Sequence, residues 1–161
     1  MQRFSETNPK LGITMLATCN TLSPSQLAVE VESRGFDSLW LPEHSHIPTS
    51  RATPFPGAAP AREELPDVYW HLNDQLVALS MAAAVTENLI LGTAVTLVAQ
   101  HDPIWLAKQL ATLDFHSQGR LEVGVGFGWN REEYGYPRIN DGLMIFWKNL
   151  YNFQMQLMMI R

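Results

Sequence analysis

The chain has 161 residues, of which 46% are hydrophobic and 17% charged, a composition typical of one folded globular domain. Eleven Lys and Arg residues against 16 Asp and Glu residues give a net charge of −5, so the chain lacks the basic surface that attracts nucleic acids or anionic membranes. The single cysteine, Cys19, excludes an internal disulfide, and the N-terminus has no signal-peptide pattern, so we expect a cytoplasmic protein.

Two strands and one helix are predicted between residues 11 and 41. Residues 11–17 (LGITMLA) form a short apolar run, typical of a strand that is buried on both faces. A helix should begin at Ser23-Pro24-Ser25-Gln26, which combines a capping hydroxyl, a proline in the first helical position and a Gln three residues after the cap. Gly35 should end this helix. Residues 38–41 (SLWL) predict the second strand, which ends before Pro42.

A long loop and two further helix–strand units follow. Six of the ten prolines lie in residues 42–72, which excludes a helix interior or a central strand, and loops of this length are usually functional or disordered. Residues 73–86 predict a helix and residues 89–97 a third strand. Asp102 should cap the next helix, which Gly119 should close, and residues 121–125 predict a fourth strand. The predicted apolar stripe of that helix consists of Ile104, Ala107, Leu110 and Ala111.

Strands that alternate with helices predict an α/β fold with a parallel sheet and right-handed crossovers. Two architectures are compatible with this order, an open doubly wound sheet and part of a (β/α)8 barrel, which needs about 250 residues. The chain length favours the open sheet. Its dinucleotide-binding signature is absent, however, because Trp129 stands where a third glycine would follow Gly124 and Gly126.

Polar residues follow three of the predicted strands, at the carboxyl ends where parallel α/β folds bind ligands. The candidates are Glu43, His44 and His46 after the second strand, His101 and Asp102 after the third, and residues 126–130 with Glu133 after the fourth. A histidine beside a carboxylate suits proton transfer near neutral pH, and Gly126 and Gly128 would let a ligand approach the backbone. Each histidine could equally be structural, and the glycines could equally serve close packing.

Together with the proline-rich loop, three segments resemble the luciferase-like monooxygenase superfamily, and within it the oxidoreductases that use the deazaflavin coenzyme F420. They are residues 35–44 (GFDSLWLPEH), 89–114 (LILGTAVTLVAQHDPIWLAKQLATLD) and 119–134 (GRLEVGVGFGWNREEY). The resemblance implies a TIM barrel rather than an open sheet. It identifies residues 1–134 as the N-terminal half of the barrel, with about four βα units, and leaves residues 135–161 as a divergent hydrophobic C-terminal tail.

The resemblance also implies roles for individual residues. Glu43 and His44 match the family's acidic–His pair, whose histidine lies beside the reactive ring and assists proton transfer. Ala94-Val95 falls where the family has a non-prolyl cis peptide behind the deazaflavin, and Gly126-Phe127-Gly128-Trp129 matches the backbone stretch that lines the cofactor. The implied activity is hydride transfer between coenzyme F420 and a small organic substrate, with FMN as the alternative cofactor.

The family pattern is not recognisable after Tyr134, so we expect a truncated chain whose exposed sheet edges favour self-association or a homo-oligomer. The apolar run of residues 143–160 is interrupted by Lys148 and by Asn and Gln residues, so we expect no membrane span. Two other functions stay open. One is a metal-dependent TIM-barrel hydrolase that uses His44 and His46, with His101 or Glu43 as a further ligand. The other is a family remnant without activity.

Overall fold

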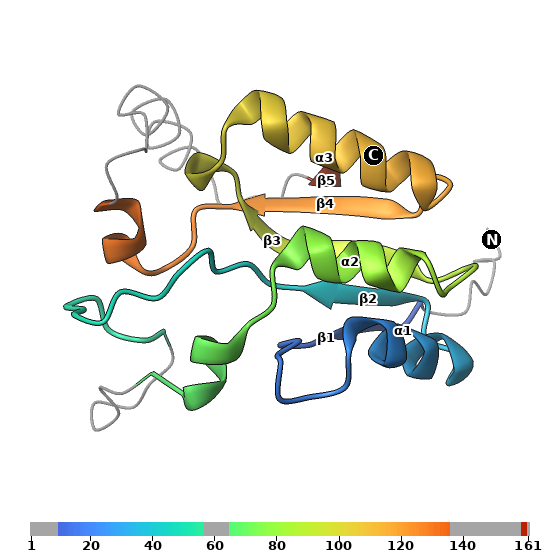
Figure 1. The fold of residues 1–161 in the computed structure, drawn as a ribbon, viewed down its shortest axis with the longest axis horizontal. Coiled ribbons are helices and arrows are strands. Elements are labelled where there is room, and N and C mark those ends of the chain that lie inside the picture. Colours follow the sequence, from blue (N-terminus) through green and yellow to red (C-terminus); the bar gives the residue numbers. More distant parts are fainter. Residues whose placement is uncertain (1–9, 57–64, 136–158, 161) are drawn as a thin grey trace, which may run out of the picture.

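The computed structural model describes residues 10–56, 65–135 and 159–160, and its centre is a sheet with the strand order β1-β2-β3-β4-β5 (Figure 1). The strands are β1 (Gly12–Thr14), β2 (Ser38–Leu41), β3 (Ile90–Leu97), β4 (Leu121–Gly126) and β5 (Met159–Ile160). The first four strands are parallel, as predicted. The short β5 pairs antiparallel with β4 at Val123 and Gly124.

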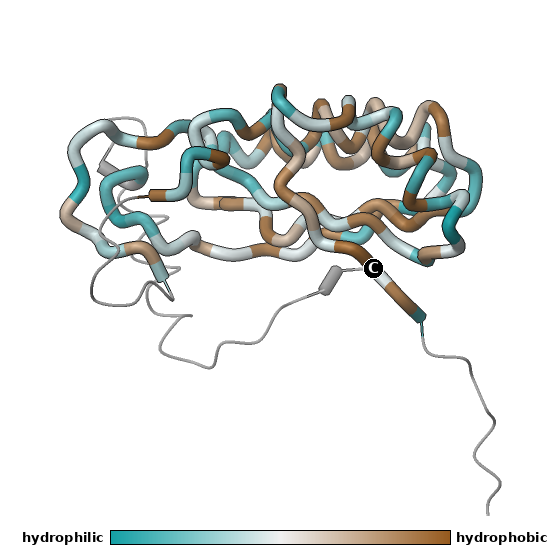
Figure 2. Tube along the Cα trace, turned by 90° about the horizontal axis from the view of Figure 1, so that it is seen from below, coloured by the Kyte–Doolittle hydropathy of each residue, from teal (hydrophilic) through white to brown (hydrophobic). Residues whose placement is uncertain are grey.

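The helices decide between the two architectures that the sequence left open. The α-helices are α1 (Pro24–Ser33), α2 (Gln75–Ala83) and α3 (Pro103–His116), and the 3-10 helices are η1 (Asp67–His71), η2 (Val98–Gln100) and η3 (Arg131–Gly135). The order of the parallel strands never reverses, so right-handed crossovers place α1, α2 and α3 on one face of the sheet (Figure 2). A doubly wound sheet has helices on both faces. The fold is therefore part of a TIM-barrel type, as the family resemblance implies.

The predicted ends of α1 and α3 are confirmed, whereas the helix predicted over residues 73–86 is shorter and spans Gln75–Ala83. Ser23 and Gln26 form a complete capping box at the start of α1. Asp102 accepts hydrogen bonds from the backbone N–H groups of Ile104 and Trp105 at the start of α3, both at 3.0 Å. Gly35 and Gly119 follow α1 and α3 with positive φ values of 80° and 77°, a conformation that glycine adopts without steric cost.

The main hydrophobic core lies between the sheet and the helices. Leu39 of β2 and Leu91 of β3 are 1% and 0% exposed, and Leu79 of α2 is 0% exposed against them in the same cluster. Burying one such leucine side chain stabilises the fold by about 1.5–3 kcal/mol. The core thus fixes the relative positions of β2, β3 and α2, whose ends carry the candidate site.

Two sequence predictions about burial were wrong. Residues 11–17 were expected to form a strand buried on both faces, but β1 has three residues, lies at the sheet edge and has Leu11 59% exposed beside it. Of the apolar stripe predicted for α3, Ile104 is 80% exposed and Ala107 and Ala111 are exposed as well, so only Leu110 of that stripe packs against the core. Helix α3 instead packs through Leu106, Leu110 and Leu113, which share a face because they are spaced i, i+4 and i+7.

The proline-rich loop is more structured than predicted at its C-terminal end. It contains η1, and Thr18 forms an antiparallel bridge with Leu72, which ties this end of the loop to the segment after β1. Residues 57–64 and most of the predicted tail, 136–158 and 161, lie outside the described residues. None of the helices that the structure describes combines the length and apolar character needed to cross a bilayer.

Candidate active site

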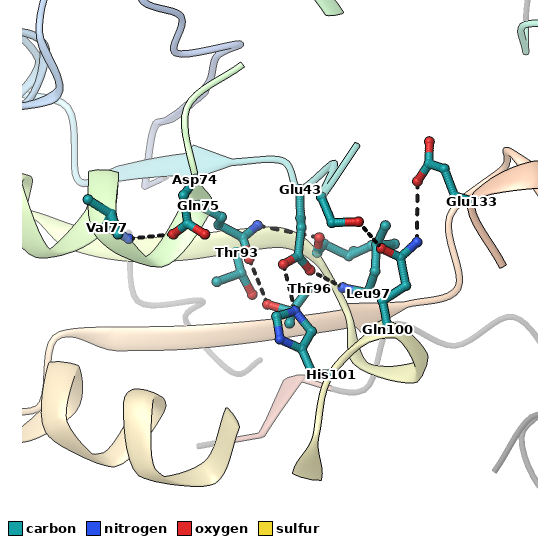
Figure 3. Close-up of polar contacts among 12 residues, drawn as sticks. Glu43, Asp74, Gln75, Val77, Thr93, Thr96, Leu97, Gln100, His101 and Glu133 are labelled. Carbon is teal, nitrogen blue, oxygen red and sulfur yellow. Dashed lines mark hydrogen bonds and ion pairs between the residues drawn. The ribbon is translucent and has the colours of Figure 1, made fainter. Parts of the chain in front are cut away.

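The carboxyl ends of β2 and β3 are joined by the side chain of Glu43 (Figure 3). The backbone N–H of Leu97 donates to Glu43 Oε2 at 2.5 Å, and His101 Nε2 lies 2.6 Å from Glu43 Oε1. The hydrogen bond with Glu43 raises the pKa of His101; burial opposes this rise, and the negative charges of Glu43 and Asp74 add to it. The predicted acidic residue therefore pairs with His101 after β3.

His44 pairs with a different carboxylate, that of Glu133 in η3. His44 Nδ1 lies 2.8 Å from Glu133 Oε1, and the two side chains are 7% and 1% exposed. This contact joins the end of β2 to the segment after β4. Glu133 follows a strand end in the sequence, but the spacing of 89 residues gave no sign that it reaches His44.

Two amide side chains complete the surroundings of Glu133. Asn130 Nδ2 donates to Glu133 Oε1 at 3.1 Å. Gln100 Nε2 donates to Glu133 Oε2 at 3.3 Å (Figure 3). Ser45 Oγ in turn donates to Gln100 Oε1 at 2.7 Å. The segments after β2, β3 and β4 thus meet in one hydrogen-bonded network around a buried carboxyl group.

Four aromatic rings pack edge to face beside this network, and we call them the aromatic cluster: His44, Phe55, Tyr69 and Trp129. His44 lies 5.3 Å from the Tyr69 ring and 6.0 Å from the Trp129 ring, between centroids. Burial raises the pKa of Tyr69. Sequence reasoning missed Phe55 and Tyr69, because both lie in the proline-rich loop, where no periodicity indicates which residues face the site.

The end of β3 is held by a buried amide, that of Gln75 at the start of α2. Gln75 Nε2 donates to the carbonyl oxygens of Leu41 at 2.6 Å and Val95 at 3.3 Å, and Thr96 Oγ1 donates to Gln75 Oε1 at 2.8 Å (Figure 3). The peptide bond between Ala94 and Val95 is cis, as the resemblance implied. Gln75 was not predicted, although a polar residue directly after the Asp74 cap in an otherwise apolar helix was the available signal.

The two glycines of β4, Gly124 and Gly126, allow β4 to pack closely against β3. A Cβ atom on Gly126 would collide with the side chain of Val95, and one on Gly124 would collide with the carbonyl oxygen of Thr93. Gly128 has a positive φ of 69°. Close packing against β3 therefore accounts for Gly124 and Gly126, while contact of residues 126–129 with a cofactor stays a prediction.

The alternative of a metal site at His44 and His46 requires a set of ligands around one ion, and the part of the chain that the structure describes contains no such set. His44 is engaged by Glu133, His101 by Glu43, and His46 Nδ1 by Ser45 Oγ at 2.9 Å. Among the described residues, no three His, Cys, Asp or Glu side chains lie close enough to hold one metal ion.

Comparison with known proteins gives matches that cover most of the described residues. A family model described as luciferase-like monooxygenase matches residues 24–140. An uncharacterised protein of Mycobacterium tuberculosis is 45% identical over 130 residues, which are 78% of this chain and 45% of that protein. The F420-dependent glucose-6-phosphate dehydrogenase of Kineococcus radiotolerans is 32% identical over 123 residues, covering 74% of this chain and 31% of the dehydrogenase.

A solved structure has the same fold. The oxygenating constituent of 3,6-diketocamphane monooxygenase from Pseudomonas putida, in complex with FMN, superposes with a TM-score of 0.59 at 18% identity. The match covers 83% of this chain and 34% of the monooxygenase chain. The present chain spans less than half the length of the curated relatives it matches.

Proposed function

Because the chain belongs to the luciferase-like monooxygenase family, we propose that it forms part of the active site of an oxidoreductase. The proposed reaction is hydride transfer between coenzyme F420 and a small organic substrate, with reduced FMN as the alternative cofactor. We propose coenzyme F420 before FMN because a relative that is 32% identical is named for its dependence on F420. The monooxygenase solved with FMN is only 18% identical, so its similarity supports the fold alone.

One observation carries the proposal, the surroundings of His44. Its ring is buried beside Tyr69 and Trp129 and its Nδ1 atom contacts Glu133, while Nε2 has no hydrogen-bond partner among the described residues. A ring nitrogen that can exchange a proton, set among aromatic side chains, fits a flat redox ring with polar edges. A bound F420 or flavin would supply the hydride chemistry, which no protein side chain provides.

The residues of this chain would contribute position and proton transfer. We assign His44 the movement of the proton that accompanies the hydride. The Ala94-Val95 peptide and residues 126–129 would contact the ring. Glu43, whose contacts go to Leu97 and His101, would act by holding the ends of β2 and β3 together.

Cofactor binding by the full chain tests the proposal. Titration of F420, followed by its fluorescence, should give a dissociation constant in the micromolar range that His44→Ala and Trp129→Ala abolish. His116→Ala, at the exposed end of α3, is the matched control and should bind like the wild type. Failure of the folded wild-type chain to bind either F420 or FMN would favour the inactive remnant, and stoichiometric zinc without cofactor binding would favour the hydrolase.

We also propose that the chain self-associates. Large apolar side chains are exposed around the groove between α2 and α3, including Val77 at 61% and Trp105 at 70%. Apolar area of this kind on adjacent helices is a common interaction surface. Sedimentation velocity should show a species heavier than one chain, and Trp105→Asp should shift the population toward the single chain. A monodisperse wild-type monomer would contradict this proposal.

A further inference from the structure

Glu133 is a buried acidic residue to which the proposed reaction gives no role. Its side chain is 1% exposed, and a carboxyl group is rarely so buried without partners that compensate for lost hydration. The partners are His44 Nδ1 at 2.8 Å, Asn130 Nδ2 at 3.1 Å and Gln100 Nε2 at 3.3 Å. Every one of these atoms can donate a hydrogen bond.

The hydrogen bonds that Glu133 accepts from Asn130 and Gln100 indicate which atom is the donor in its contact with His44. Ser45 Oγ donates to Gln100 Oε1, which turns the Gln100 amide nitrogen toward Glu133 Oε2. Oε1 also accepts from Asn130. A carboxyl group whose two oxygens both receive N–H donors is suited to the ionised form, which only accepts. His44 Nδ1 must then carry the proton in their contact.

We propose that Glu133 is a positioning residue that holds neutral His44 as the Nδ1–H tautomer. In this form the basic lone pair lies on Nε2, the ring nitrogen without a hydrogen-bond partner among the described residues. Neutral histidine in water prefers the opposite tautomer, with the proton on Nε2. Glu133 therefore selects which nitrogen of His44 accepts a proton, and this role rests on the proposed function of His44.

The position of Glu133 adds a second consequence. Glu133 lies in η3, beyond the end of β4, and the residues it contacts follow β2 and β3. The tautomer and orientation of His44 thus depend on docking of residues 130–133 against the other two strand ends. A fixed orientation of a proton-transfer group contributes to catalysis because the group needs no reorganisation during the reaction.

Nitrogen NMR of the histidine rings tests the inference in the full chain without cofactor. The sample carries ¹⁵N-labelled histidine at a pH where the rings are neutral, and His44 is assigned by the loss of its signals in His44→Gln. The wild type should show a pyrrole-type shift at Nδ1 and a pyridine-type shift at Nε2. Glu133→Met, which removes the acceptor with little change in volume, should exchange the two shift types.

Two further variants complete the experiment. Glu133→Gln offers an amide oxygen at the same place and should restore the Nδ1–H pattern. Glu122→Gln, at the start of β4, is the control for loss of a carboxylate from the same part of the chain and should keep the wild-type pattern. A wild-type His44 with its proton on Nε2 would overturn the inference, as would an unchanged pattern in folded Glu133→Met.

The result is independent of the cofactor titration. Failure to bind F420 and FMN with an intact Nδ1–H pattern would reject the proposed function and leave the tautomer assignment standing. Cofactor binding by a wild type with the Nε2–H pattern would reject the role of Glu133 and leave the proposed function standing. If Glu133→Met does not fold, the wild-type tautomer decides.

Discussion

The imidazole of His101 lies 2.6 Å from the carboxylate of Glu43, so an ion pair as well as the sheet joins the ends of β2 and β3. The Glu43 side chain is 8% exposed and the His101 side chain 25%. The negative charge of Glu43 strengthens the hydrogen bond that protonated His101 donates. Asp74 is a second negative charge that favours the protonated form of the same ring.

The raised pKa of His101 predicts a pH-dependent contribution to stability. A histidine whose pKa is higher in the folded state stabilises the fold fully below its unfolded value of 6.5, and this stabilisation is lost as the pH rises through the folded pKa. His101→Gln should therefore lower the free energy of unfolding by about 1 kcal/mol at pH 5.5 and by less at pH 8.5. Urea denaturation at both pH values measures the difference. A constant difference would contradict the ion pair.

Much of the scaffold could be predicted from the sequence because it is encoded locally. The Ser23–Gln26 capping box, the Asp102 cap and the strand at residues 38–41 each depend on a few adjacent residues, and all three are present in the structure. The apolar side of α3 was misassigned because several helical stripes fit its composition, and packing against α2 and β4 selects the one through Leu106 and Leu113.

The sequence predicted where the site residues lie better than it predicted which of them pair. Parallel strands bring their carboxyl ends to one edge, so Glu43, His44, His101 and Glu133 could be expected near each other. Which carboxylate meets which imidazole depends on side-chain directions after the strands end, where neither period 2 nor period 3.6 applies. The adjacent Glu43 and His44 suggested one pair, but in the structure Glu43 pairs with His101 and His44 pairs with Glu133.

Glu32 predicts a different pH dependence, at the opposite end of the strands. Its carboxylate accepts the backbone N–H groups of Glu87, Asn88 and Leu89 before β3. Burial opposes ionisation, but the hydrogen bonds from Asn88, Leu89 and Glu87 and the charge of Arg120 hold the pKa of Glu32 below its usual value of 4.5. Its stabilisation is present above pH 4.5 and is lost as the pH falls through the folded pKa.

Glu32→Gln should accordingly destabilise the fold by about 1 kcal/mol at pH 7, a modest value because solvent screens the site. The difference from the wild type should shrink below pH 4. Glu30→Gln is the matched control on the same helix, since Glu30 forms an exposed i,i+4 pair with Arg34 that is worth about 0.5 kcal/mol or less. Equal losses in the two variants, measured by urea denaturation, would refute the role of Glu32.

Arg120 is expected to be a stability residue that does not affect the candidate site. Its guanidinium donates to the carbonyl oxygens of Ser117, Leu89 and Ala83 and to Thr86 Oγ1, at 2.8–3.0 Å, so it ties the ends of α2 and α3 to the start of β3. Arg120→Lys cannot reproduce this planar set of donors and should lower the free energy of unfolding by about 2 kcal/mol. Cofactor binding at a temperature where the variant is folded should be unchanged, and a loss of binding there would contradict this separation.

Glu132 is expected to hold the loop after β2 in place. Its Oε1 atom accepts the backbone N–H groups of Ala52 and Thr53 at 2.8 and 3.0 Å. The hydrogen bond with the Thr53 side chain contributes most to lowering the pKa of Glu132 to about 2, and the backbone donors add to it. The interaction should therefore be complete above pH 4.5 and disappear as the pH falls toward 2. Phe55 of the aromatic cluster lies two residues beyond Thr53, so release of this contact should also loosen the cluster.

Hydrogen exchange at neutral pH measures the effect of Glu132→Gln directly. The amides of Ala52 and Thr53 should exchange at least several-fold faster than in the wild type, because an amide side chain loses the charge that strengthens both hydrogen bonds. Amides in β3 should keep their protection, since Glu132 contacts the loop and not the sheet core. Arg131→Gln, at the neighbouring position of η3, is the control and should leave the loop amides protected. Unchanged exchange at Ala52 and Thr53 in Glu132→Gln would show that the loop is held by other contacts, with the aromatic cluster as the next candidate.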